Sequence, residues 1–207
     1  MTSGASRTRV TRGDWVQAAL TALKEHGIGR VKVAVLAEQL GVARSSFYWY
    51  FADRTALETA LLEVWAAHNT APIIERAARP AATVAAAVYG LFECWADPAL
   101  FDHRLEFAVR EWARRDDDVR ARLQHADVDR IAAIAALHRR YGDDETTAMV
   151  RARVQYHSQI GMYALAVDEP FEERLRMAPT YVEVFTGTAP TEADTAAFTQ
   201  WVTGHQA

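Results

Sequence analysis

The stretch LAEQLGVARSSFYWYFADRTAL, residues 36–57, decides the fold class that we expect for this chain. Over residues 33–40, apolar side chains recur at i, i+3, i+4 and i+7, the spacing of one face of a short helix. Gly41 ends that helix, and residues 42–51 predict a second helix of about two turns. Two short helices joined by a glycine-containing turn are typical of the helix-turn-helix, which places its second helix in the major groove of DNA. On spacing alone, a small helical domain with an aromatic-rich packing helix is the alternative.

A helix is predicted on each side of this pair. Thr11 and Asp14 have the spacing of a capping box, and Gly27 can end the helix that begins there. An apolar stripe over residues 16–23 gives this first helix a buried face. Asp53 is a suitable N-cap for the helix that follows the pair, which we expect to run to about residue 69.

The chain beyond residue 54 predicts helices throughout. The expected segments are 81–96, 99–114, 117–140, 144–167, 170–186 and 192–204. Breaks are expected at Pro72 and Pro80, because proline lacks the N–H that continues a helix. The fold class is therefore all-α. We expect a disordered basic arm over residues 1–10, a three-helix DNA-binding domain with the helix-turn-helix over residues 11–53, and a helical bundle over residues 54–207.

The charge of the chain is divided unevenly along its length. The 207 residues carry 23 Lys/Arg and 27 Asp/Glu, a formal net charge of -4. Residues 1–54 hold eight of the basic and four of the acidic residues, a balance of +4, so the remainder carries -8. A basic head on an acidic body can bind phosphate while the body stays clear of nucleic acid. A nonspecific architectural DNA binder needs a broadly basic surface and is disfavoured.

Other protein classes are disfavoured by what the sequence lacks. Cys94 is the single cysteine, which excludes an internal disulfide and a cysteine-based zinc cluster. His138 and His157 have no partner ligands at a convincing spacing, so we expect no metal and no cofactor. The chain has no HExxH, no Gly-rich phosphate loop and no nucleophile elbow, which argues against an enzyme. Without a signal-peptide pattern or about 18 uninterrupted apolar residues, a cytoplasmic protein with no membrane partner is expected.

Residues 36–57 resemble the signature of the TetR (tetracycline-repressor-like) family of transcriptional regulators. The shared features are an apolar-Ala pair, Leu-Gly-Val, a small polar pair, an apolar-Tyr pair, a Phe, and then a basic residue and a Leu that open the next helix. The resemblance extends over residues 12 to about 62. It implies a repressor that binds a palindromic operator in double-stranded DNA as a homodimer. It also implies that a small hydrophobic ligand releases the protein from its operator.

The resemblance assigns the DNA contacts residue by residue. Arg44 and Ser45 would face the bases, where arginine can make a bidentate contact to guanine. Arg54, at the start of the next helix, would hold a phosphate with help from the helix dipole. The other expected DNA-binding residues are Lys32 and Val33 at the start of the second helix, Ser46, Tyr48 and Tyr50 as phosphate or sugar contacts, and Trp49. Lys32 and Ala43 depart from the family pattern, since Ser or Thr usually caps these two short helices.

A homodimer is expected because one helix-turn-helix makes too few contacts to specify an operator. The segment 144–167 carries two apolar sets, and a helix buried on two sides usually packs against its own body and a partner. The predicted interface residues are Met149, Ala152, Tyr156, Ile160, Tyr163, Val182 and Phe185. The second, flanking set is Val150, Val154, Gly161 and Leu165. The alternative is an interior helix of a monomer.

The middle of the chain is rich in aromatic residues, and the resemblance implies an effector pocket within the helical body. The expected lining residues are Trp65, Phe92, Trp95, Phe107, Trp112, Tyr156, Gln159 and Tyr163. An apolar cavity with a few polar groups would suit a small hydrophobic ligand. The alternative is that these aromatic side chains only form the core.

Overall fold

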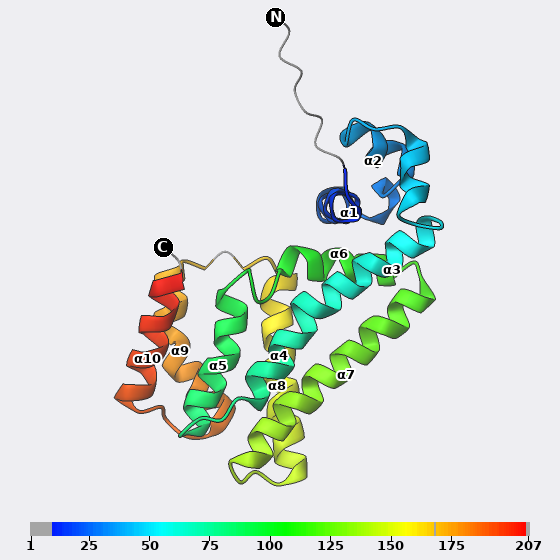
Figure 1. The fold of residues 1–207 in the computed structure, drawn as a ribbon. Coiled ribbons are helices and arrows are strands. Elements are labelled where there is room, and N and C mark those ends of the chain that lie inside the picture. The colour runs from blue at the N-terminus through cyan, green and yellow to red at the C-terminus, as the bar shows by residue number, and fades with distance from the viewer. Residues whose placement is uncertain (1–9, 168, 206–207) are drawn as a thin grey trace, which may run out of the picture.

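The computed structural model describes residues 10–167 and 169–205, and over these residues the regular structure is helical (Figure 1). The predicted arm over residues 1–10 lies, apart from Val10, outside the described residues. The α-helices are α1 (Arg12–His26), α2 (Val33–Gln39), α3 (Arg54–Trp65), α4 (Ala71–Ala78), α5 (Val84–Ala96), α6 (His103–Ala113), α7 (Asp117–Arg140), α8 (Glu145–Ala164), α9 (Phe171–Thr186) and α10 (Glu192–His205). Shorter turns are η1 (Ile28–Arg30), η2 (Arg44–Trp49) and η3 (Ala66–Thr70). The prediction of an all-α fold is confirmed.

The start of α1 is fixed by local hydrogen bonds that the sequence predicts. The Thr11 hydroxyl accepts from the backbone N–H of Asp14 at 3.3 Å, and the Asp14 carboxylate accepts from the N–H of Thr11 at 2.7 Å. This capping box satisfies two of the donors that a helix leaves free at its N-terminus. At the other end, Gly27 has φ 76°, a conformation that glycine adopts without strain.

The expected break at Pro72 is wrong. Helix α3, the π-helical turn η3 and α4 follow one another without a gap from Arg54 to Ala78, and Figure 1 shows them as one rod that leads from the N-terminal helices into the body. The N–H of Ala71 bonds to the carbonyl of Ala66, five residues back. This wider turn accommodates Pro72, which sits in the first turn of α4, where its missing N–H costs little.

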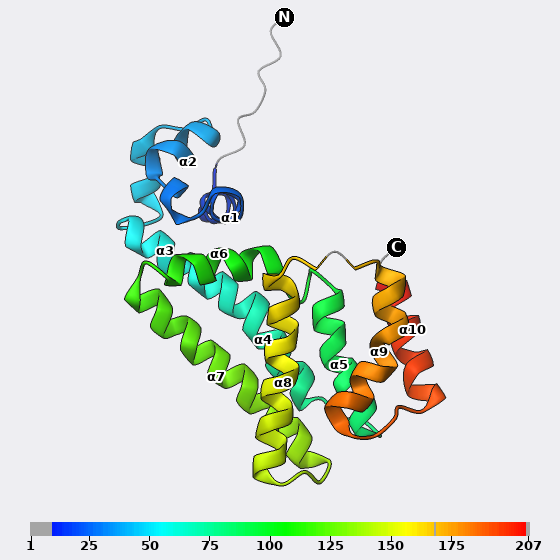
Figure 2. The same ribbon diagram turned by 180° about the vertical axis from the view of Figure 1, so that it is seen from behind.

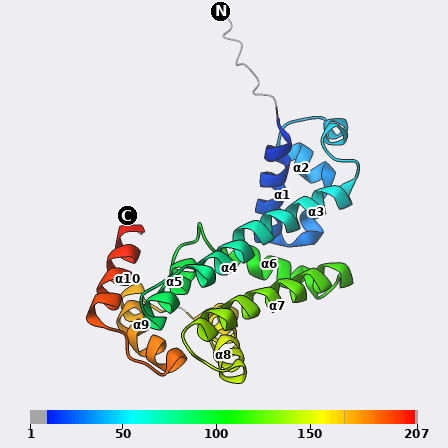
Figure 3. The same ribbon diagram turned by 60° about the horizontal axis from the view of Figure 1, so that its bottom comes forward.

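Two hydrophobic cores divide the molecule. The first joins α1, α2, η2 and α3 to α6 and the first half of α7, so the N-terminal helices are packed on the body and not only tethered to it. The second core is formed by α4, α5, the second half of α7, α8, α9 and α10. Figures 2 and 3 show the N-terminal helices at one end of the molecule and α9 and α10 at the other.

A polar layer, defined here as Glu106, Arg110, Asp127, Arg130 and Tyr156, separates the two cores. Arg130 and Glu106 are fully buried and form an ion pair at 2.9 Å. The Tyr156 hydroxyl accepts from Arg130 at 2.8 Å and donates to Asp127 at 2.6 Å. On α7, Arg130 therefore lies between residues of the first core and residues of the second.

The turn η3 supplies further partners to this layer. The Thr70 hydroxyl accepts from Arg130 at 2.8 Å, and the Asn69 amide donates to Glu106 at 3.1 Å. Trp65, the last residue of α3, donates its indole N–H to the same carboxylate at 2.7 Å. Buried charges are tolerated only when they are paired and hydrogen-bonded, and this set of contacts meets that condition.

Candidate functional site

The helix η2, called the reader helix from here on, has one buried and one exposed face. Phe47 is fully buried, and its ring packs at 5.2 Å centroid distance against both Trp15 of α1 and Phe51. The opposite face presents Arg44, Ser45, Tyr48 and Trp49, all exposed. Trp49 is 75% exposed and Tyr48 53%, which is unusual for such large aromatic side chains.

The caps of the two short helices lack the usual side chains, as the sequence indicates. Neither Lys32 before α2 nor Ala43 before the reader helix makes a capping side-chain hydrogen bond within the described part of the chain. The Ser46 hydroxyl, predicted to touch phosphate, donates instead to the Ala43 carbonyl at 2.7 Å. Lys32 is exposed and Val33 half-buried at the start of α2. The reader helix is accordingly a 3-10 helix held chiefly by Phe47.

Two of the predicted phosphate contacts are engaged with the protein itself. The Tyr50 hydroxyl donates to the carbonyl of Val10 at 2.6 Å, so it ties the start of the described chain to the end of the reader helix. Arg54 pairs with Glu58 at 2.8 Å and donates to the carbonyl of Ile28 at 3.3 Å. Arg54 would have to exchange these weak surface contacts for a phosphate, which costs little because such pairs contribute about 0–1 kcal/mol.

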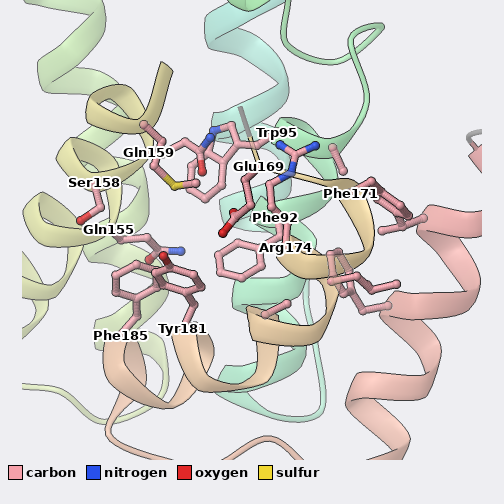
Figure 4. A pocket seen from close by; sticks show the side chains of 16 residues that line it. Phe92, Trp95, Gln155, Ser158, Gln159, Glu169, Phe171, Arg174, Tyr181 and Phe185 are labelled. Atoms are coloured by element: carbon pink, nitrogen blue, oxygen red, sulfur yellow. The ribbon is translucent and has the colours of Figure 1, made fainter. Parts of the chain in front are cut away.

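A cavity of about 100 Å³ lies in the body (Figure 4). Its walls come from α5, α8, α9 and α10 and from Glu169, which lies between α8 and α9. They comprise Phe92, Trp95, Ala96, Gln155, Ser158, Gln159, Met162, Glu169, Phe171, Arg174, Leu175, Ala178, Tyr181, Phe185, Phe198 and Val202. Most of this lining is apolar, as expected of a small-molecule site.

Three of the predicted pocket residues, Phe92, Trp95 and Gln159, line this cavity. The other five lie elsewhere. Trp65 belongs to the first core and Tyr156 to the polar layer. Phe107, Trp112 and Tyr163 line a separate surface groove between the end of α1 and α6.

The predicted pocket residues do not include the side chains that α9 and α10 contribute to the cavity. Gln155 carried a usable signal, because it lies four residues before Gln159 and so on the same helix face. The residues from α9 and α10 carried none, because their approach to α5 and α8 is set by tertiary packing alone. Phe185, predicted at the dimer interface, is one of these cavity residues.

The predicted interface residues lie mostly inside the subunit. Ala152, Tyr156, Val182 and Phe185 are buried within its own core, so they offer no surface to a partner. Met149, Ile160 and Tyr163 are half-buried. The flanking set on α8 is the exposed one, with Val150 at 54% and Val154 at 48%. On α9, Val184 at 69% and Tyr181 at 37% are also exposed.

Burial shifts the pKa of several groups in the body. It raises the pKa of the Cys94 thiol to about 12 and that of the Tyr163 hydroxyl to about 12. It lowers the pKa of the His138 imidazole, although Gln155 and Asp143 oppose the shift, so that ring is neutral at pH 7. Within the described ranges, no three His, Cys, Asp or Glu side chains are grouped to hold a metal ion. Among the described helices, none is both long and apolar enough to cross a membrane.

A short helix with an exposed polar face, set behind a glycine turn and anchored by one buried aromatic ring, defines the helix-turn-helix class of DNA-binding domain. Residues 16–61 match the model of the bacterial regulatory proteins of the tetR family. The N-terminal part of the chain therefore carries a tetR-family domain, where the signature over residues 36–57 predicts it. The proteins that this model describes are bacterial regulatory proteins.

One curated relative and two solved structures are similar to this chain. The tetracycline repressor protein class A of transposon 1721 from Escherichia coli is 36% identical over 70 residues. That match covers 34% of this chain and 32% of the repressor, so it spans about a third of the curated relative. AmtR from Mycobacterium smegmatis has a TM-score of 0.63 at 18% identity and covers 98% of both chains. A candidate transcriptional regulator from Pseudomonas aeruginosa PAO1 also reaches 0.63, at 14% identity over 96% of this chain and 99% of its own. These two structures share the fold.

Proposed function

We propose that the protein is a transcriptional repressor that binds a palindromic DNA operator as a homodimer and leaves it when a small ligand binds in the body. The observation that carries the proposal is the reader helix. Its buried Phe47 fixes which face points outward, and that face carries Arg44, Ser45, Tyr48 and Trp49. Exposed aromatic and basic side chains gathered on one short helix need a partner that covers them.

The reader helix has the chemistry to recognise DNA. We propose that Arg44 and Ser45 face the base edges, since arginine can bond guanine through two N–H groups at once. Tyr48 and Trp49 would pack on the sugar–phosphate backbone, and Lys32 would pair with a phosphate at the start of α2. The balance of +4 in residues 1–54 against -8 in the remainder orients the molecule with its N-terminal end toward the DNA.

Two copies are needed, and α8 and α9 offer the surface to join them. Val150 and Val154 are one helical turn apart on α8, and Val184 and Tyr181 add exposed apolar area on α9. We propose that these two helices pair with the same helices of a second copy. Such a two-fold interface would set the two reader helices about 34–36 Å apart, the separation of successive major grooves.

Ligand binding would act on DNA affinity through a shift between two conformations. The rod α3–η3–α4 runs from the helix-turn-helix to the body, and its last residue before η3, Trp65, is hydrogen-bonded to Glu106 of the polar layer. A ligand that favours another placement of α5, α8 and α9 would move Tyr156 on α8 and thereby the layer that holds the rod. The two reader helices would then lose their spacing.

The proposal is tested by a gel shift with the DNA that flanks the protein's own gene. We expect a discrete complex at physiological salt and binding at least about 10³-fold weaker to a scrambled duplex of the same length and composition. Equal affinity for both duplexes would identify a nonspecific binder and contradict the proposal. A variant with Tyr48 replaced by alanine should bind both duplexes more weakly, whereas Val128→Ala, at an exposed position on α7, serves as the control.

A further inference from the structure

The cavity between α5, α8, α9 and α10 is too small for a large effector. Its volume of about 100 Å³ is below the roughly 150 Å³ of an engineered apolar cavity that holds benzene. The cavity is partly open, so one ring can enter it while a substituent extends toward the polar part of the wall. The rings of Phe92, Tyr181 and Phe185 form one side of this space (Figure 4). The aromatic lining favours a ligand with a single aromatic ring, which at this volume would lie partly in the open mouth of the cavity.

Three polar atoms of the cavity wall are buried without a hydrogen-bond partner in the described part of the chain. They are Nε1 of Trp95, Nε2 of Gln155 and Oε2 of Glu169. Gln155 is fully buried and Trp95 is 9% exposed. A buried donor or acceptor without a partner destabilises the fold, so three such atoms around one cavity indicate groups that a ligand satisfies.

The side-chain amide of Gln155 contacts the ring of a buried histidine. Its Oε1 atom lies 3.3 Å from Nε2 of the buried His138 ring. With the His138 proton on Nε2, that ring donates to the Gln155 oxygen, and the Gln155 Nε2 atom is left without a partner among the described residues. Figure 4 shows this amide and the Glu169 carboxylate both directed into the space beside the Phe92 ring.

The polar wall thus presents two N–H donors and one carboxylate acceptor. We propose that the cavity binds a small one-ring aromatic amide, whose carbonyl oxygen accepts from Gln155 and Trp95 and whose N–H donates to Glu169; the inference rests on the proposed ligand-responsive function. An aromatic ketone would leave Glu169 without a donor. An aromatic carboxylate would bring a second negative charge to Glu169. Arg174, which also lines the cavity, is exposed and hydrated, so its attraction for such an anion is weak.

The test is calorimetric titration of the full chain with benzamide, acetophenone and benzoate as probes. We expect benzamide to bind at least about tenfold more tightly than acetophenone, the factor for one hydrogen bond to a charged group. Benzoate should bind most weakly. Acetophenone or benzoate binding as tightly as benzamide, or no heat with any probe at about 10 mM, would overturn the proposal.

Two variants locate the binding site. Glu169→Gln should reduce the preference for benzamide over acetophenone to less than about threefold, because the charged acceptor is gone. Gln155→Leu should weaken benzamide and acetophenone alike, since both use the carbonyl contact. The exposed residues Glu172 and Gln124 provide matched controls, and Glu172→Gln and Gln124→Leu should leave both affinities unchanged. An unchanged preference in Glu169→Gln would overturn the proposal even if Gln155→Leu fails to fold.

Operator binding, measured separately, distinguishes this inference from the function on which it rests. If the chain binds its operator but shows no preference for benzamide, the ligand chemistry proposed here is wrong and the repressor function stands. If the preference holds and the chain ignores the operator, the repressor function is wrong and the cavity assignment stands.

Discussion

Phe47 and Arg44 occupy opposite faces of the reader helix, and their separation explains how so short a helix can present a defined surface. Phe47 is held between Trp15 and Phe51, so the helix cannot rotate about its axis without exposing a large ring. Full exposure of such a ring costs roughly 1.5–3 kcal/mol. The conformation of the reader helix therefore depends on packing, because Ala43 at its start makes no capping side-chain hydrogen bond. The same holds for Lys32 at the start of α2.

Arg44→Ala should relax the base preference at one position of the operator. Loss of a bidentate contact to guanine costs about 1–3 kcal/mol at that position and leaves the other positions unchanged. The measurement is a comparison of affinities for operators substituted one base pair at a time. Arg122→Ala, an exposed arginine on α7, is the control. If Arg44→Ala weakens every sequence equally, Arg44 contacts phosphate and not a base.

Cys94 should be unreactive in the folded protein. The thiol is fully buried, and burial raises its pKa to about 12, so almost no thiolate forms at pH 8. An aromatic disulfide reagent should therefore modify Cys94 only as fast as the protein unfolds, and at once in denaturant. Rapid modification of the native protein at pH 8 would show that α5 opens to solvent.

At the scale of elements, the sequence predicts where the helices begin and end better than it predicts which side of each helix is buried. The expected segment 117–140 coincides with α7, and 170–186 and 192–204 differ from α9 and α10 by one residue at one end. Local signals such as caps, glycine and apolar periodicity determine these limits. The continuous helix at Pro72 could not be predicted, because the π-helical turn that accommodates this proline depends on the contacts of Asn69 and Thr70 with distant residues.

Helix α8 shows why the buried sides of the helices and the walls of the cavity could not be predicted from the sequence. This helix carries apolar residues on two sides, and periodicity alone cannot tell which side meets α7 and α5. The structure buries Ala152 and Tyr156 and exposes Val150 and Val154. Likewise, the cavity depends on α9 and α10 folding back against α5, an approach that leaves no mark in the sequence. The helix-turn-helix was predictable because its residues are contiguous.

Arg130→Met should destabilise the fold strongly. Removing the guanidinium leaves the buried Glu106 carboxylate without its main partner, a loss of about 3–5 kcal/mol. Arg139→Met is the matched control, because Arg139 pairs with Glu145 at the surface, where about 0–1 kcal/mol is expected. Denaturant unfolding gives both values. Similar losses in the two variants would mean that the polar layer is no more important than a surface ion pair.

At the scale of the whole molecule, the proposed operator binding requires two copies joined through α8 and α9. Val154→Arg places a charge in the proposed interface and should raise the dimer dissociation constant by more than about tenfold, the factor for roughly 1.4 kcal/mol. Val128→Arg, at a valine on α7 that is 62% exposed against 48% for Val154, should leave the dimer intact. Sedimentation velocity distinguishes the two states. A dimer that tolerates Val154→Arg and dissociates with Val128→Arg would place the interface on α7 instead.

The spacing of the operator half-sites tests the central claim most directly. Once the operator is mapped, about five base pairs, half a duplex turn, are inserted between its two halves and the affinity is measured again. If the dimer holds its two reader helices rigidly, tight binding is lost, because the insertion turns the second half-site to the opposite side of the duplex. Unchanged affinity would show that each copy binds its half-site alone and would contradict the account.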